Sequence, residues 1–367
     1  MTVAVPRDAA TVVVVRDAGA GLEVLLLQRA ERGDHNSGAW VFPGGLLDPA
    51  DRAAEASAAG LTDEQASALL GLERGGLAFF IAAIRECFEE SGILFAQDAQ
   101  GAFASLEGDE GAQLAALRHE LKDGACDLAD ICRRFSLRLV PEQLHYIGHW
   151  LTPAGRAKRF DTRFFLAIAP ARQTAMHDAT ETLDHVWIAP RDALSPSNAR
   201  RLMTPTRAML EVLLPFPSTE PLAAWASSPR QVERVLPRLA MGPAGLQPVQ
   251  SEHPAYDEIG KLDPDGRGDA WSELRPGVAV RIGEHVERRA RSDASQRRLA
   301  RAPRWFSAQT LVPTRTLKLR KIRLALLVEG VDRFHVIGRL VGDGLQPRRH
   351  LQQAVQARML AFTQQLL

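Results

Sequence analysis

Three glutamates, Glu86, Glu89 and Glu90, stand at positions i, i+3 and i+4 of the chain. On a helix this spacing brings the three carboxylates onto one face, where like charges repel. A hard divalent cation, Mg²⁺ or Mn²⁺, would offset the repulsion, because such ions take oxygen ligands and bridge to phosphates. The alternative is a solvated acidic helix face, which is the more common role of three glutamates taken alone.

A helix over residues 77–91 is predicted to carry these glutamates. Its apolar residues recur with a period of 3.6 on the face opposite the carboxylates, and Gly92 supplies the stop signal. Cys87 lies on the apolar stripe, so we expect it to be a small core residue. The stripe consists of Leu77, Phe80, Ile81, Ile84, Cys87 and Phe88.

The elements around this helix alternate between strands and helices. Residues 11–15 and 22–28 predict a β-hairpin with its turn at residues 19–21, and residues 40–42 predict a third strand that ends at Pro43, Gly44 and Gly45. Residues 48–76 and 113–135 predict helical insertions, the first of them a surface excursion. Further strands are expected at 145–151, 160–169 and 184–188, and a helix at 204–214.

The segment from Arg85 to Ile93 resembles the second half of the Nudix box, the motif G-x5-E-x7-R-E-U-x-E-E-x-G-U in which U is apolar. It agrees at every defined position if Cys87 is accepted as U: Arg85, Glu86, Cys87, Glu89, Glu90, Gly92 and Ile93. The first half departs from the motif, because Asp51 stands six residues after Gly45 where the family has glutamate, and a long insertion separates it from Arg85. Either Asp51 reaches Arg85 with its shorter side chain, or the pairing of the two is lost.

The interruption of the box narrows the resemblance to one subgroup of the Nudix family. Together with residues 27–48 and 150–165, it is similar to the subgroup that contains the peroxisomal coenzyme A diphosphatases with an interrupted Nudix box. The resemblance implies an α/β Nudix fold, a mixed β-sheet sandwiched between helices with helical insertions, in a domain over residues 1–225.

The same resemblance implies a reaction and a site. The reaction would be Mg²⁺- or Mn²⁺-dependent hydrolysis of the diphosphate of coenzyme A or acyl-CoA to 3′,5′-ADP and (acyl-)phosphopantetheine. ADP-ribose or another nucleotide sugar is the alternative substrate, and a non-catalytic nucleotide-sensing regulator is the alternative class. Metal ligands would be Glu86, Glu89 and Glu90; catalytic residues would be Glu86, Arg85 and a distal carboxylate, Glu181; substrate contacts would be Arg29, Gly44, Gly45, Arg159 and Arg163.

Composition limits the other possibilities. Lysines and arginines (45) nearly cancel aspartates and glutamates (44), so charge predicts no particular partner. The N-terminal residues lack the features of a signal peptide and no stretch reaches membrane-spanning length, which predicts a cytoplasmic protein without a membrane partner. A small nucleoside diphosphate derivative is the expected partner, nucleic acid is disfavoured, and a homodimer is compatible with the sequence.

Residues 226–367 predict a smaller C-terminal α+β region of unknown role. Prolines at 215–229 are typical of a linker, and two strands are expected around Gly330. The stretch 253–278 is similar to the linker in bacterial proteins that fuse a Nudix domain to a metallo-β-lactamase-like domain. The HxHxDH metal motif of that fold is absent from the sequence. The region could therefore be a relic of such a fused domain, without a second hydrolytic centre.

Overall fold

A computed structural model describes residues 3–30 and 37–273, together with the backbone of five strands between residues 279 and 339. The chain divides into two compact units, Met1–Ala270 and Trp271–Leu367. In the second unit the five strands form an antiparallel sheet in chain order. They are β13 (Ala279–Gly283), β14 (Val286–Arg289), β15 (Phe306–Thr310), β16 (Ile322–Glu329) and β17 (Arg333–Arg339).

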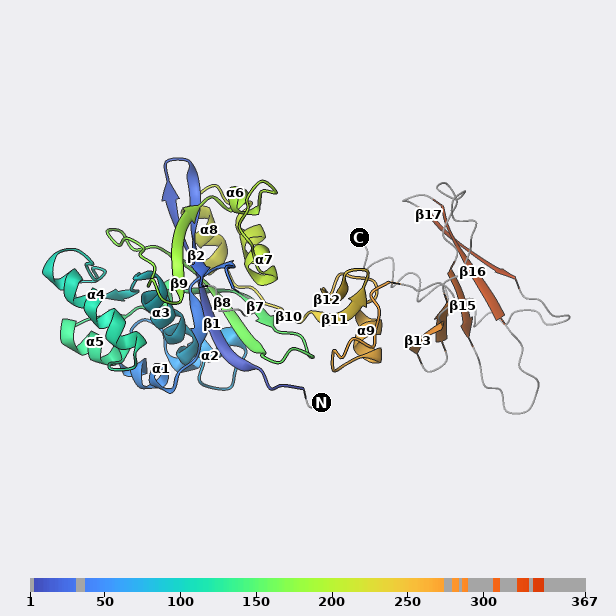
Figure 1. Cartoon of the computed structure of the whole chain (residues 1–367), viewed down its shortest axis with the longest axis horizontal. Helices are drawn as coiled ribbons and strands as arrows, with labels where there is room; N and C mark the ends of the chain where they lie inside the picture. Colours follow the sequence, from blue (N-terminus) through green and yellow to red (C-terminus); the bar gives the residue numbers. More distant parts are fainter. Residues whose placement is uncertain are drawn as a thin grey trace. The chain divides into compact units, whose positions relative to one another are not determined.

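The first unit is built on a mixed eight-stranded sheet (Figure 1), with the order β10-β7-β8-β1-β2-β3, β4 beside β1 and β9 beside β2. Residues 7–15 of the long strand β1 pair parallel with the whole of β8. Within that stretch Val12, Val13, Val14 and Val15 are fully buried. A continuous apolar run of this kind is typical of a strand covered on both faces. The strands are β1 (Arg7–Ala18), β2 (Gly21–Arg29), β3 (Trp40–Val41), β4 (Gly44–Leu46), β7 (His145–Leu151), β8 (Phe160–Ile168), β9 (Thr182–Ile188) and β10 (Arg234–Val235).

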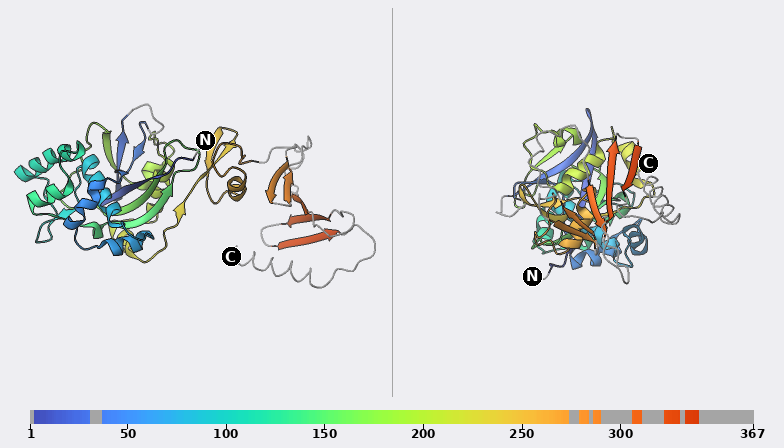
Figure 2. Two further views of the ribbon diagram at one scale, coloured as in Figure 1. Left: turned by 90° about the horizontal axis from the view of Figure 1, so that it is seen from below. Right: turned by 90° about the vertical axis from the view of Figure 1, so that its right-hand side faces the viewer.

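Helices cover both faces of this sheet (Figures 1 and 2). The core on one face is formed with α2 to α5, and the core on the other face with α6 to α8. The predicted sandwich, the β1–β2 hairpin and the two helical insertions are thereby confirmed. The helices are α1 (Pro49–Ala53), α2 (Asp63–Leu70), α3 (Leu77–Ser91), α4 (Gly108–Lys122), α5 (Leu128–Phe135), α6 (Pro190–Leu194), α7 (Thr204–Leu213) and α8 (Thr219–Ser227), with 3-10 turns at Ala54–Ser57 and Pro141–Gln143.

The first insertion is part of the core, which corrects the expected surface excursion. Asp63 in α2 accepts hydrogen bonds from the backbone N–H groups of Gly75 and Leu77, both at 2.9 Å. It thus caps the start of α3, where donors without helical partners are otherwise left. Gly76 lets the two helices approach closely, because a Cβ there would lie 2.5 Å from the Cα of Ser67. The insertion therefore fixes the N-terminal end of α3, the helix that carries the glutamates.

The proline-containing stretch after α7 is not a linker throughout. Residues 219–227 form α8, and its Leu222 and Ala226 are buried against the sheet. Beyond it, β10 pairs with β7, and the compact unit continues to Ala270, while the domain boundary expected at residue 225 stays a prediction. The last elements are β11 (Arg238–Gly242), β12 (Gly245–Val249) and α9 (Tyr256–Leu262), and a two-stranded ribbon, β5 (Ala96–Gln97) with β6 (Arg138–Leu139), lies earlier in the chain.

Within the described part of the chain, no helix has the length and apolar character that a membrane crossing requires.

Candidate active site

Helix α3 brings Arg85, Glu86, Glu89 and Glu90 together, as predicted from their spacing. It ends at Gly92, whose φ of 74° is the left-handed conformation that glycine tolerates best. The helix is buried on almost every side, and Glu90 is only 6% exposed. A solvated acidic face is therefore excluded. The sequence predicted an apolar face on one side of the helix only. In the structure, the side that carries the carboxylates also faces the interior of the unit.

Arg85 is the centre of an ion-pair network. Its Nε and Nη2 atoms donate to the two carboxylate oxygens of Asp51 at 2.7 and 3.1 Å. Its Nη1 atom donates to Glu86 Oε1 at 2.9 Å and to Glu89 Oε1 at 3.3 Å, and Nη2 also donates to the carbonyl oxygen of Leu46 at 2.8 Å. Of the two outcomes left open by the sequence, the structure shows the first: Asp51 reaches Arg85.

The two glycines after strand β3 make room for the glutamates. The backbone N–H of Gly44 donates to Glu90 Oε2 at 3.0 Å. A Cβ on Gly45 would lie 2.6 Å from the carboxyl carbon of Glu86, closer than any real contact. Strand β4 holds both glycines by pairing with β1, where Thr11 faces Gly44 and Ala10 faces Gly45. The Gly-Gly pair therefore shapes the carboxylate site directly.

Burial makes the negative charges of this site costly. It raises the pKa of Glu86 to about 7, an effect that Glu89 increases and Arg85 opposes. It also raises the pKa of Glu90 to about 8, and repulsion by Glu86 adds to the shift. A divalent cation would remove this penalty, and an all-oxygen donor set is the set that Mg²⁺ and Mn²⁺ prefer.

The three glutamates do not converge on one point. Glu89 turns toward Arg85, whereas Glu90 turns toward Gly44. Among the residues that the structure describes, their carboxylates are not gathered within 4.8 Å of one another as a group of three. Mg²⁺ is commonly bound through one or two carboxylates, with waters and substrate phosphates completing the shell. Glu86 and Glu90 fit that mode of binding best.

The distal candidate Glu181 lies close enough to Glu90 to raise the pKa of that carboxyl by its charge, after burial and the charge of Glu86. Its carbonyl oxygen accepts a hydrogen bond from Ala30 N at 2.8 Å, which ties it to the end of β2. Arg29 also acts on Glu90, in the opposite sense, and lowers its pKa. Glu181 and Arg29 therefore lie within electrostatic range of Glu90.

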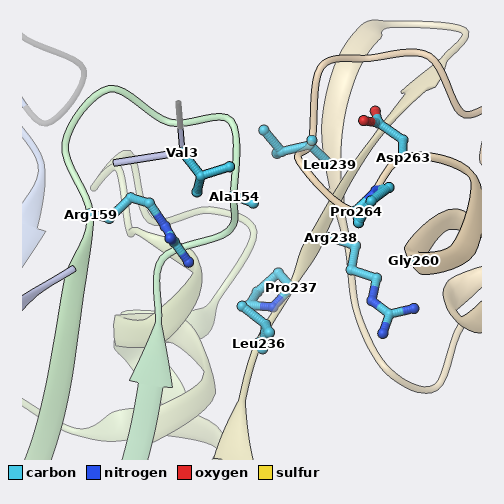
Figure 3. A pocket seen from close by; sticks show the side chains of 11 residues that line it. Val3, Ala154, Arg159, Leu236, Pro237, Arg238, Leu239, Gly260, Asp263 and Pro264 are labelled. Carbon is cyan, nitrogen blue, oxygen red and sulfur yellow. The ribbon is translucent and has the colours of Figure 1, made fainter. Parts of the chain in front are cut away.

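Arg159 and Arg163 are engaged elsewhere. Arg159 donates from Nε to Thr152 O at 3.0 Å and from Nη1 to Ala4 O at 2.9 Å, and it lines a pocket of about 330 Å³ beside Val3 and Ala154 (Figure 3). Arg163 is 5% exposed, stacks on Phe79 and pairs with Asp161 at 3.2 Å. Within the described part of the chain, neither arginine makes a hydrogen bond or ion pair with the glutamates of α3, and their contact with substrate stays a prediction.

Several supporting residues left no signal in the sequence. Arg118 of α4 donates from Nε to the carbonyl oxygen of Glu89 at 2.9 Å, near the C-terminal end of α3 where positive charge is favourable. Asp178 holds the loop that carries Glu181, since its Oδ1 accepts from the backbone N–H groups of Thr180, Glu181 and Thr182 and its Oδ2 pairs with Lys122. The contacts of Arg118 with Glu89 and of Lys122 with Asp178 join residues far apart in the chain, so no local pattern predicts them.

Comparison with known proteins agrees with this geometry. Residues 5–59 match the NUDIX domain, and residues 55–212 match the NUDT19 Nudix domain. The two matches meet within the insertion that separates Asp51 from Arg85. A solved NUDIX hydrolase from Alicyclobacillus acidocaldarius is 27% identical, with a TM-score of 0.50, and the match covers 60% of this chain and 96% of that one. The first unit therefore contains a Nudix domain.

Within that class, the subgroup is the one expected from the interrupted box. Acyl-coenzyme A diphosphatase NUDT19 of Homo sapiens is 29% identical over 52% of this chain and 60% of its own length. The protein of the same name from Gallus gallus is 31% identical over 47% of this chain and 55% of its own length. The chain thus spans somewhat more than half the length of these relatives. The domain belongs with the NUDT19 type of Nudix domain.

Proposed function

We propose that this protein hydrolyses the diphosphate bond of coenzyme A or acyl-CoA to 3′,5′-ADP and (acyl-)phosphopantetheine, with Mg²⁺ or Mn²⁺ as cofactor. The observation that carries the proposal is the network of Asp51, Arg85 and Glu86, which is complete although the box is interrupted. A domain that had lost catalysis would have no need of this network around buried carboxylates. The similarity to the human and chicken acyl-coenzyme A diphosphatases supports the substrate class.

In this proposal Glu86 and Glu90 bind the cation, and Glu89 contributes directly or through water. Arg85 holds Glu86 and Glu89 in place through Nη1, while Asp51 fixes the guanidinium from the other side. When bound, the ion supplies positive charge that neutralises phosphate oxygens and promotes ionisation of the attacking water. The carboxylates of the chain orient that water and accept its proton.

Two carboxylates are candidates for the proton acceptor. Glu86 has a pKa raised to about 7 by burial, which suits proton transfer near neutral pH. Glu181 lies in the connection before β9, and its charge acts on Glu90. We favour Glu181, because Glu86 is needed as a metal ligand and already accepts a hydrogen bond from Arg85.

Substrate selection must come from groups outside the diphosphate, since every candidate substrate shares that group. Arg29, at the end of β2, is the cation best placed to meet a phosphate oxygen. Its charge already acts on Glu90, one of the proposed metal ligands. Gly44 and Gly45 offer backbone that a phosphate can approach without a side chain in the way. A cytoplasmic location and a homodimer remain predictions of the sequence.

The substrate is tested by measuring kcat/KM for coenzyme A, dephospho-coenzyme A and ADP-ribose side by side with Mg²⁺. The proposal expects coenzyme A to be preferred, because its additional phosphate offers contacts that the other two lack. Preference for ADP-ribose would transfer the function to nucleotide sugars. Binding of all three without turnover would support a nucleotide sensor instead.

A further inference from the structure

Two histidines and an aspartate form a second cluster of metal-ligating groups, outside the glutamates of α3. The ligand atoms of His177, Asp184 and His185 all lie within 4.8 Å of one another. The Nδ1 atoms of His177 and His185 are 2.9 Å apart, and the two rings are tilted by 46°. Two imidazoles with one carboxylate suit Zn²⁺ and similar ions, whereas Mg²⁺ prefers oxygen ligands alone.

The backbone on both sides of His177 is fixed by hydrogen bonds. Before it, the N–H of Met176 donates to Ser91 O at the end of α3, at 2.8 Å. After it, the Asp178 carboxylate accepts from the N–H groups of Thr180, Glu181 and Thr182 at 2.9–3.0 Å and pairs with Lys122. A histidine between two such anchors is positioned before any ligand arrives, which is what a metal site requires.

Asp184 and His185 are held on the opposite side of the cluster by strand β9. His185 faces Leu27 of β2, and Asp184 faces Gln28. Because paired residues of neighbouring strands share a face, His185 lies on the sheet face of Leu27, which belongs to the core beneath α3. The cluster therefore joins the loop of His177 to an edge strand of the sheet.

The contact between the two rings can hold only one proton. With both Nδ1 atoms at 2.9 Å, one must donate and the other accept, so a second proton in the contact would point two N–H groups at each other. Neutral imidazoles are the form that binds metal. Two nitrogen ligands of a tetrahedral ion stand about 3.3 Å apart for bonds of about 2.0–2.1 Å, so the rings need to separate by only a few tenths of an ångström.

We propose that His177, Asp184 and His185 form a binding site for a transition-metal ion of the Zn²⁺ class, separate from the glutamates that take Mg²⁺. Three protein ligands leave at least one coordination position for water or another ligand. Because the same connection between β8 and β9 also carries Glu181, an ion in this site clamps that residue's loop to the sheet.

The experiment is a titration of the full-length, metal-free protein with Zn²⁺ in competition with a chromophoric chelator, in the presence of excess Mg²⁺ to occupy the glutamates. One Zn²⁺ should bind per chain, and Co²⁺ in its place should give the visible absorption of a nitrogen- and oxygen-ligated ion. His177→Ala and His185→Ala should each weaken Zn²⁺ binding by about 100-fold or more, and Asp184→Asn by about 10-fold.

His119→Ala is the matched control, because His119 is exposed on α4 and should leave Zn²⁺ affinity unchanged. The proposal would be overturned if both His177→Ala and His185→Ala kept the wild-type Zn²⁺ affinity, or if no Zn²⁺ bound in the presence of excess Mg²⁺. The cluster would then be only a hydrogen bond between two rings. Asp184→Asn changes an exposed side chain, so it remains informative if a histidine variant folds poorly. No turnover is measured, so the result is independent of the proposed hydrolysis.

Discussion

Asp51 and Arg85 stand 34 residues apart and meet in a two-point contact, Nε to Oδ1 at 2.7 Å and Nη2 to Oδ2 at 3.1 Å. Asp51 is 1% exposed, so the pair is shielded from water. Such fork-to-fork contacts fix geometry as well as charge. The insertion between the two residues thus leaves the pairing intact, and aspartate serves where the family motif has glutamate.

Asp51→Asn should destabilise the fold by about 1–3 kcal/mol, because it removes a buried charge from Arg85. Asp130→Asn is a matched control. Both aspartates occupy the N3 position of a capping box, but the ion pair of Asp130 is with the exposed Arg133. The control should lose less than about 1 kcal/mol. Urea unfolding of both variants measures the difference, and equal losses would show that the contact with Arg85 contributes nothing beyond the cap.

Gly45→Ala should lower turnover by about tenfold or more with little loss of stability. The new Cβ would displace the Glu86 carboxylate, which is the end of a flexible side chain and can move at small cost. Gly19→Ala is the control, since a Cβ there has no atom within 4 Å from any described residue other than its chain neighbours. Comparison of kcat and melting temperature tests this, and full activity of Gly45→Ala would mean that the position of Glu86 is not critical.

The metal-free protein should lose stability as pH rises from about 5 to about 8. Burial raises the pKa values of Glu86 and Glu90 from 4.5 to about 7 and about 8, so the folded state holds more protons than the unfolded state across this range. Mg²⁺ replaces those protons, and its effect on the melting temperature should be larger at high pH. An equal Mg²⁺ effect at pH values of about 6 and 8.5 would contradict the assignment of these carboxylates as ligands.

Glu181→Gln should reduce kcat by about 100-fold or more and leave Mg²⁺ affinity nearly unchanged, if this side chain accepts the proton of the attacking water. Glu73→Gln, an exposed glutamate in another loop, provides the comparison. Retention of kcat in Glu181→Gln would assign proton transfer to a glutamate of α3.

A chain ending after Ala270 should retain hydrolysis, because the glutamates, Asp51 and Glu181 all lie in the first unit. Ending at Pro229 deletes β10, which pairs with His149 and Trp150 of β7, and leaves that strand edge open. The shorter protein should aggregate more readily. Light scattering and specific activity of the two truncations distinguish these outcomes.

Much of the first unit could be predicted because its signals are local. The period of α3, the stop at Gly92 and the alternation of the hairpin are each encoded within a few residues. The sequence could not show that Glu90 is buried, because burial depends on insertions folding over the helix. It indicated a linker where α8 packs, since prolines report local breaks and not the burial of Leu222. The ion pair of Asp178 with Lys122 and the contact of His177 with His185 depend on how the chain folds, so the sequence alone did not show them.

Glu86 and Glu90 are the proposed metal ligands, and the turnover of coenzyme A by Glu86→Gln and Glu90→Gln with Mg²⁺ tests that assignment. Both amides keep the shape of the side chain and remove its charge, so each should lower kcat by about 100- to 1,000-fold while circular dichroism stays unchanged. Glu64→Gln, exposed on α2, should keep the wild-type rate. Release of 3′,5′-ADP by either amide variant at a near-wild-type rate would contradict the assignment.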